Sequence, residues 1–300
     1  MALSADPRWP RAGDWPAATG ETVDFGLIGV PTYKTSLSPT RAYTTQAAVR
    51  EALRYYSDFV SPYRSVSGRQ QRSLSYAQWP AVVDPDDDED GAIEAVAAAA
   101  ASARLLFVLG GDNAATVPAA LGTWGARVPT AGLVTLDAHH DVRDGRSNGS
   151  PVRRLIEAGL DGRRVVQIGI ADFANSAEYS ARARDFGITI IHRNELVHRP
   201  IADAMAEALE TAGGAGGPVH VDLDVDVCDR SVAPACPAAV PGGISAVELR
   251  TAARVAGRHP AVESIDITEV DAAADAPDQR TVRLAALCVL EAAAGLAERS

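Results

Sequence analysis

The stretch G-L-V-T-L-D-A-H-H-D, residues 132–141, sets both the fold and the expected chemistry of this 300-residue chain. Its first five residues carry no charge, which is typical of a strand buried on both faces of a parallel sheet. Polar residues begin at Asp137, and open α/β sheets bind their ligands beside the carboxyl ends of their strands. Side chains two positions apart on extended backbone share a face, so Asp137, His139 and Asp141 can converge if the segment stays extended or curls slightly.

A second stretch, H-V-D-L-D-V-D-V at residues 220–227, ends another apolar strand. Its alternation would place Asp222, Asp224 and Asp226 on one side of that strand. Carboxylates so close must take up protons or bind a cation, because an unpaired buried charge is very costly. One such motif is a weak sign, but two after separate strands predict a centre for two hard or borderline divalent ions such as manganese.

Around these stretches, short β-rich runs alternate with alanine-rich helical runs. This order predicts a mostly parallel sheet with helices on both faces. The expected strands are Val23–Val30, Trp79–Val83, Leu105–Leu109, Gly132–Leu136, Arg164–Ile170, Ile188–Ile191, Val219–Asp224 and Val262–Thr268. The expected helices are Thr45–Tyr56, Ala92–Ala103, Pro151–Ala158, Ala177–Phe186, Ile201–Thr211, Ala246–Gly257 and Arg280–Ala297.

Composition limits the class of protein. A net charge of −11 would repel nucleic acid and anionic membranes, so we expect neither as a partner. The three cysteines are odd in number and the first residues have no apolar signal segment, which indicates a cytoplasmic protein. No linker divides the sequence, so we expect one domain over residues 1–300. The acidic run Asp84–Asp90 is interpreted as a solvated loop before a helix rather than a cation site.

Five motifs follow one another along the chain: G-V-P at 29–31, G-G-D-N at 110–113, D-A-H-H-D at 137–141, D-L-D-V-D-V-C-D-R-S-V-A-P with P-G-G over 222–243, and I-D-I-T-E-V at 265–270. Together they resemble the ureohydrolase family of arginases and agmatinases. The resemblance implies a three-layer α/β/α fold with an eight-stranded mostly parallel sheet, two manganese ions per subunit and a homo-oligomer, trimeric or hexameric. It implies one metal site of Asn113, Asp137, Asp141 and Asp224, and another of Asp137, His139, Asp224 and Asp226.

Two positions depart from the family pattern. Asn113 stands where the family usually has histidine, and an amide oxygen is a weaker ligand than imidazole, so that metal site would be weak. Asn148 stands where arginases and agmatinases have a histidine. With Arg143 and the D-R-S of residues 229–231, these changes resemble the formiminoglutamase branch, which hydrolyses N-formimino-L-glutamate to L-glutamate and formamide in histidine degradation.

The resemblance also suggests residue roles. In this hypothesis a metal-activated hydroxide attacks the formimino carbon, Asp141 transfers a proton, and Glu269 holds the planar amidinium. Arg143 belongs to a local basic excess that suits a substrate with two carboxylates and would repel cationic agmatine. Ser147, Asn148 and Ser150 are candidate substrate donors, although a turn before a helix with Pro151 at its first position explains them equally well.

The sequence leaves open two other functions and the role of two cysteines. The chain can be an agmatinase or guanidino-acid ureohydrolase that releases urea. It can also be a catalytically weakened, arginase-like binding subunit, since Asn113 and Asn148 both remove histidines. Cys228 and Cys236, beside the second aspartate motif, are either small buried apolar residues or an oxidation switch.

Overall fold

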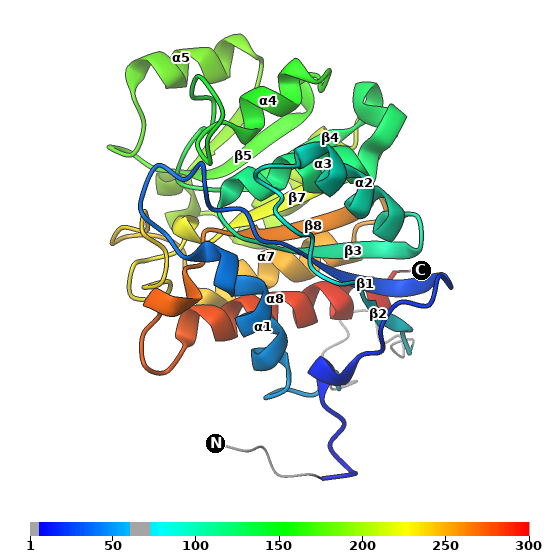
Figure 1. Ribbon diagram of the computed structural model, residues 1–300. Coiled ribbons are helices and arrows are strands. Elements are labelled where there is room, and N and C mark those ends of the chain that lie inside the picture. Colours follow the sequence, from blue (N-terminus) through cyan, green and yellow to red (C-terminus); the bar gives the residue numbers. More distant parts are fainter. Residues whose placement is uncertain (1–5, 61–72, 300) are drawn as a thin grey trace.

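The computed structural model describes residues 6–60 and 73–299. Within these ranges eight parallel strands form one sheet in the order β2-β1-β3-β8-β7-β4-β5-β6, which crosses the middle of Figure 1. The strands are β1 (Val23–Val30), β2 (Tyr76–Gln78), β3 (Ala103–Gly110), β4 (Gly132–Leu136), β5 (Val165–Ile170), β6 (Thr189–His192), β7 (Val219–Asp224) and β8 (Val262–Thr268).

Helices cover both faces of the sheet, which makes three layers (Figure 1). On one face the apolar core joins the strands to α1 (Thr45–Leu53), α6 (Ile201–Ala212), α7 (Ala246–Arg258) and α8 (Arg280–Ala297). On the other face it joins them to α2 (Glu89–Ala100), α3 (Thr116–Trp124), α4 (Pro151–Glu157) and α5 (Ala177–Asp185). The predicted three-layer α/β/α fold is confirmed, and every strand pairing is parallel.

Two elements differ from the prediction. The strand expected at Trp79–Val83 is wrong: β2 lies earlier, at Tyr76–Gln78. Trp79 N and Val82 N still donate to Leu27 O and Gly29 O of β1, but Pro80 between them has no N–H to contribute to a regular ladder. Helix α3 was not predicted, because Pro118 and Gly122 interrupt its helical pattern. Pro118 lies in the first turn, where a backbone N–H has no partner within the helix.

The acidic run is only partly a solvated loop. Asp88 caps α2 by accepting a hydrogen bond from Gly91 N at 2.9 Å, as expected for a loop before a helix. Asp86, however, is buried and accepts hydrogen bonds from the backbone N–H groups of Tyr33 and Lys34. It therefore fastens the loop after β1 to the loop before α2.

Helices α7 and α8 approach each other closely through glycine. A methyl group at Gly257 would overlap the carbonyl of Ala292, and one at Gly295 would overlap the carbonyl of Arg254.

Across the described residues, no helix has both the length and the apolar character needed to cross a bilayer.

Candidate metal centre

Four neighbouring strands, in the order β3-β8-β7-β4, bring the predicted site residues to one edge of the sheet. Asp137 follows β4, Asp224 ends β7, Glu269 follows β8, and Asn113 begins a 3-10 turn just after β3. Because parallel strands end at the same edge, four segments far apart in the sequence meet there.

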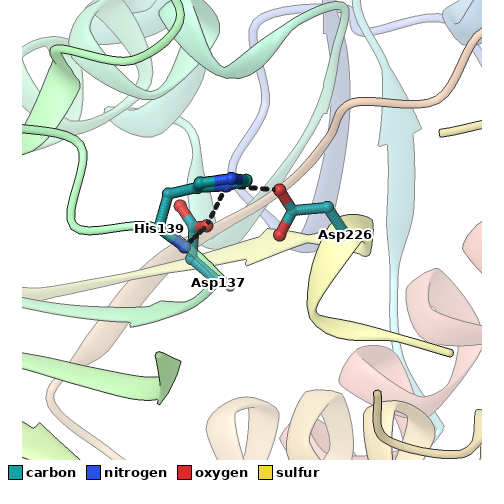
Figure 2. A group of neighbouring side chains, drawn as sticks. All are labelled: Asp137, His139 and Asp226. Atoms are coloured by element: carbon teal, nitrogen blue, oxygen red, sulfur yellow. Dashed lines mark hydrogen bonds and ion pairs between the residues drawn. The ribbon is translucent and has the colours of Figure 1, made fainter. Parts of the chain in front are cut away.

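The centre of the site is an acid–histidine–acid cluster. The His139 ring points toward Asp137 and Asp226, as Figure 2 shows. Its Nδ1 lies 2.7 Å from Asp226 Oδ2 and 3.4 Å from Asp137 Oδ1. Among the described residues these three form the one group of acidic, histidine or cysteine side chains with ligand atoms all within 4.8 Å. Both carboxylates are buried, whereas the His139 side chain keeps 29% of its exposure.

The sequence predicted that strand alternation would position Asp226, but the structure positions it by a turn. Strand β7 ends at Asp224, and Val225–Val227 form a 3-10 turn that Asp224 caps by accepting from Asp226 N at 2.8 Å. Asp222 and Asp224 lie two positions apart in β7 and so share a face, and Asp222 Oδ1 is 3.4 Å from Thr268 Oγ1. The prediction that all three aspartates share one side of the strand is therefore wrong for Asp226, which lies beyond the strand.

Asn113 connects Asp141 to this cluster. Its Nδ2 lies 2.6 Å from Asp141 Oδ2 and 3.3 Å from Asp137 Oδ2. Its Oδ1 accepts from Thr116 Oγ1 at 2.7 Å. In this orientation the amide donates to the two carboxylates, and a ligand role requires it to turn so that Oδ1 faces them.

Burial and mutual repulsion shift the pKa values of these groups. Burial raises the pKa of Asp141 and of Asp224 well above the ordinary range, with neighbouring aspartates adding to the effect. Burial, and then the charge of Asp226, raise the pKa of Asp137 to about 6. Burial alone would lower the pKa of His139, but Asp226 and Asp137 outweigh it and raise that pKa to about 12.

The donor set fits a divalent cation. His139 is the one basic side chain among the described residues that forms an ion pair with these carboxylates. One imidazolium cannot compensate Asp137, Asp141, Asp224 and Asp226 together in a buried place. Oxygen ligands with a single imidazole suit hard to borderline ions rather than thiolate-seeking ones.

Glu269 stands beside the cluster in a defined orientation. Its Oε1 accepts from Asn113 N and from Asn148 Nδ2, both at 2.8 Å. Asn148 Oδ1 in turn accepts from Leu37 N at 2.9 Å, so Asn148 connects Glu269 to the loop after β1. Burial, and then the charge of Asp112, raise the pKa of Glu269 to about 8.

This arrangement agrees with the comparisons to known proteins. A sequence model described as the arginase family matches residues 23–295. The chain belongs to the arginase family. Formimidoylglutamase of Halalkalibacterium halodurans is 31% identical over 280 residues, which cover 90% of this chain and 87% of the relative. Formimidoylglutamase of Bacillus subtilis is 32% identical over 290 residues, covering 90% and 86%.

Solved structures show the same arginase-family fold. The crystal structure of the B. subtilis formimidoylglutamase has a TM-score of 0.89 at 28% identity, covering 99% of this chain and 95% of that one. Trypanosoma cruzi formiminoglutamase with a Mn²⁺ pair has a TM-score of 0.84 at 24% identity, covering 97% and 99%. The predicted family and fold are confirmed, and with them the assignment to hydrolases of carbon–nitrogen bonds in linear amidines.

The candidate substrate residues of this arginase-family chain lie in different surroundings. Ser150 is fully buried, where its Oγ donates to Ser147 O at 2.8 Å and accepts from Ser147 N at 3.0 Å. These contacts make the serines part of a turn. Asn148 contacts Glu269, as described above. Arg143 is exposed, and its guanidinium carbon lies 5.7 Å from the centre of the Tyr179 ring without an ion pair to any described residue.

Some residues around the site were not identified from the sequence. Thr116 orients the Asn113 amide, and Arg193 donates to the carbonyls of Asp226 and Val227 at 3.3 and 3.2 Å. Arg193 follows β6, and no local motif marks it. Its contacts reach from the end of β6 to the turn after β7, across the two strands that lie between them in the sheet.

All three cysteines are free thiols without solvent exposure. Burial raises the pKa of Cys228 and of Cys236 above that of an ordinary thiol. Because the thiolate is the reactive form, this environment favours the interpretation as small buried apolar residues over an oxidation switch.

Proposed function

We propose that this arginase-family chain is a manganese-dependent formimidoylglutamase. It hydrolyses N-formimino-L-glutamate to L-glutamate and formamide, as a step of histidine degradation. The observation that carries the proposal is the contact of the Asp137–His139–Asp226 cluster with Asn113 and Asp141, beside an oriented Glu269. Relatives that match over 86% or more of their length and carry this activity support it.

We assign two manganese ions per subunit to this cluster. Asp137, His139, Asp224 and Asp226 would hold one ion, and Asn113, Asp137, Asp141 and Asp224 the other, more weakly bound one. When bound, the ion pair would supply a water that is ionised near neutral pH. The Mn²⁺ pair of the T. cruzi enzyme, which has the same fold, agrees with this choice of metal.

Glu269 binds the amidinium of the substrate. Two donors already occupy its Oε1, so Oε2 is the oxygen left for the fork of N–H groups on the formimino carbon. A positive amidinium beside this carboxylate lowers its pKa from about 8 and favours the charged form. Asn148 therefore acts on the substrate through Glu269 rather than by direct contact.

Asp141 transfers the proton. In this role the carboxyl group takes up a proton from the attacking water and releases it to the leaving nitrogen. Without metal, Asn113 Nδ2 lies 2.6 Å from Asp141 Oδ2, and this hydrogen bond is lost when the amide turns to bind the ion.

Arg143 recognises a carboxylate of the substrate. The neighbouring arginines already have partners: Arg146 of the same loop contacts Asp86 O and Glu89, and in α4 Arg153 pairs with Glu157 and Arg154 with Glu89. Arg143 is thus the guanidinium available to an anionic substrate. It disfavours agmatine, whose charge is positive.

The test is product identification with manganese-loaded protein. We expect formamide and L-glutamate from N-formimino-L-glutamate, and no urea from agmatine or 4-guanidinobutyrate. Urea from a guanidino substrate would instead make the chain a guanidine hydrolase. Ammonia in place of formamide would change the bond that is broken. Absence of manganese uptake together with absence of turnover would make it a binding subunit.

The proposal includes the location and the oligomeric state of the protein. A single-domain, cytoplasmic homo-oligomer, trimeric or hexameric, is the form we expect, acting on a small molecule without nucleic acid or membrane. Size measurement of the purified protein by light scattering checks the oligomeric state.

A further inference from the structure

His140 lies between two proposed metal ligands, His139 and Asp141, and is 2% exposed. The mechanism above gives it no role. Both nitrogens of its ring and both polar groups of its backbone nevertheless have hydrogen-bonding partners, all from elements later in the chain.

Gln167, a fully buried residue in the middle of β5, makes two of these contacts. Its Nε2 donates to His140 O at 2.8 Å, and its Oε1 lies 2.7 Å from His140 Nδ1. The Gln167 amide nitrogen donates to the His140 carbonyl, so the Gln167 amide oxygen faces the His140 ring. Because that oxygen can only accept a hydrogen bond, Nδ1 is the ring nitrogen that carries hydrogen. A single glutamine therefore fixes the backbone and the tautomer of His140.

Two residues beyond β5 make the other contacts. Asn175 Oδ1 accepts from His140 N at 3.0 Å, while Asn175 Nδ2 donates to Ala138 O at 2.9 Å. Ser180, in α5, lies 3.2 Å from His140 Nε2 and can donate to it. Asn175 thus holds the backbone on both sides of His139.

We propose that His140 is a positioning residue for the metal centre. The backbone turns sharply at the next residue, because Asp141 has a φ of 53°, which is unfavourable for a residue with a side chain. Fixing His140 holds the peptides on either side, so that His139 and Asp141 both face the cluster. The expected effect of His140 on Mn²⁺ affinity rests on the proposed function, whereas its expected effect on the backbone of residues 137–142 does not.

The test compares variants that break the contacts from either side. His140→Leu removes both ring contacts, and Gln167→Met removes both contacts of the glutamine at similar volume. In metal-free protein we expect amide hydrogen exchange over residues 137–142 to rise at least about tenfold in each variant, through local opening. We expect the Mn²⁺ affinity, measured by calorimetry, to fall about 10–100-fold, as for other residues that orient metal ligands.

Two matched variants separate positioning from general damage. His140→Asn keeps a donor near the position of Nδ1, so its Mn²⁺ affinity should stay within about threefold of wild type. His198→Leu makes the same replacement at an exposed histidine and should change neither readout. If His140→Leu fails to fold, Gln167→Met and His140→Asn carry the comparison.

Unchanged exchange over residues 137–142 in both disruptive variants would overturn the inference. So would a Mn²⁺ affinity equal to wild type in His140→Leu, or an affinity in His140→Asn as low as in His140→Leu. If the wild-type protein binds no Mn²⁺, the proposed function fails, and the exchange measurement alone decides whether His140 positions this segment.

Discussion

Asp141 and Glu269 both adopt a positive φ, of 53° and 63°. For residues with side chains this conformation costs about 1–3 kcal/mol each, and it persists where surrounding contacts fix it. Asn113 contacts both residues, through its side chain to Asp141 and through its backbone N–H to Glu269. One residue therefore holds two strained carboxylates at the same site. Backbone strain of this kind is concentrated at functional sites.

Glu269→Gln should separate activity from stability. The amide keeps the hydrogen bonds of Oε1 but loses the charge proposed to bind the amidinium, so kcat/KM should fall about 100–1000-fold with Mn²⁺ content unchanged. The raised pKa of Glu269 means that its contribution to folding is largest below its ordinary pKa of 4.5 and is lost as the pH rises through about 8. At pH 9 the metal-free variant should therefore be more stable than wild type, by at least about 1 kcal/mol. Urea unfolding at pH 5 and pH 9 measures this, and equal stabilities at pH 9 would contradict it.

The segment between β4 and α4 is held by contacts at two places. A turn of Ser147 and Ser150 comes directly before Pro151, and Arg146 pairs with Glu89 at the start of α2. Glu89 pairs with Arg146 of this segment and with Arg154 of α4, whereas Arg143 is exposed. The basic excess seen in the sequence is thus mostly structural, with one arginine available to a ligand.

Arg143→Met should affect substrate binding more than chemistry. Loss of a hydrogen bond to a charged group costs about 1.5–3 kcal/mol, so KM for N-formimino-L-glutamate should rise about 10–100-fold while kcat changes little. Arg146→Met, which removes a neighbouring arginine already bound to Glu89 and Asp86 O, is the control and should leave KM nearly unchanged. Steady-state kinetics decide the matter, and equal KM values for the two variants would contradict it.

At helix α7, Gly257→Ala sets two effects against each other. Alanine stabilises a helix interior by about 0.5–1 kcal/mol relative to glycine. Here the added methyl would overlap the Ala292 carbonyl of α8, and overpacking costs about 1–3 kcal/mol. We expect net destabilisation of about 1–2 kcal/mol in the free energy of unfolding. A gain in stability would mean that the two helices move apart without cost.

For the molecule as a whole, the sequence predicts central elements better than edges and turns. Strand β4 has the predicted ends because its uncharged run stops at Asp137, and the predicted bounds of β7 and β8, in which apolar and polar residues are mixed, are also confirmed. The edge strand β2 was misplaced because three residues carry no periodicity of their own. The turn that delivers Asp226 was missed because Asp224 caps it, a contact that alternation cannot reveal. Contacts such as that of Arg193 depend on strand order, which no local pattern encodes.

The same arrangement makes stability depend on metal, and Asp224→Asn tests this. Burial raises the pKa of Asp224, so the charged carboxylate weakens the metal-free fold above its ordinary pKa of 3.8. The amide should stabilise the metal-free protein at pH 8 by about 1–2 kcal/mol and show no such gain near pH 4. Excess Mn²⁺ at about 100 times its Kd should stabilise wild type by about 2.7 kcal/mol. The variant should lose most of that increment, because a proposed bridging ligand is missing. Urea unfolding with chelator or with Mn²⁺ measures both effects, and an undiminished Mn²⁺ increment in the variant would remove Asp224 from the metal centre.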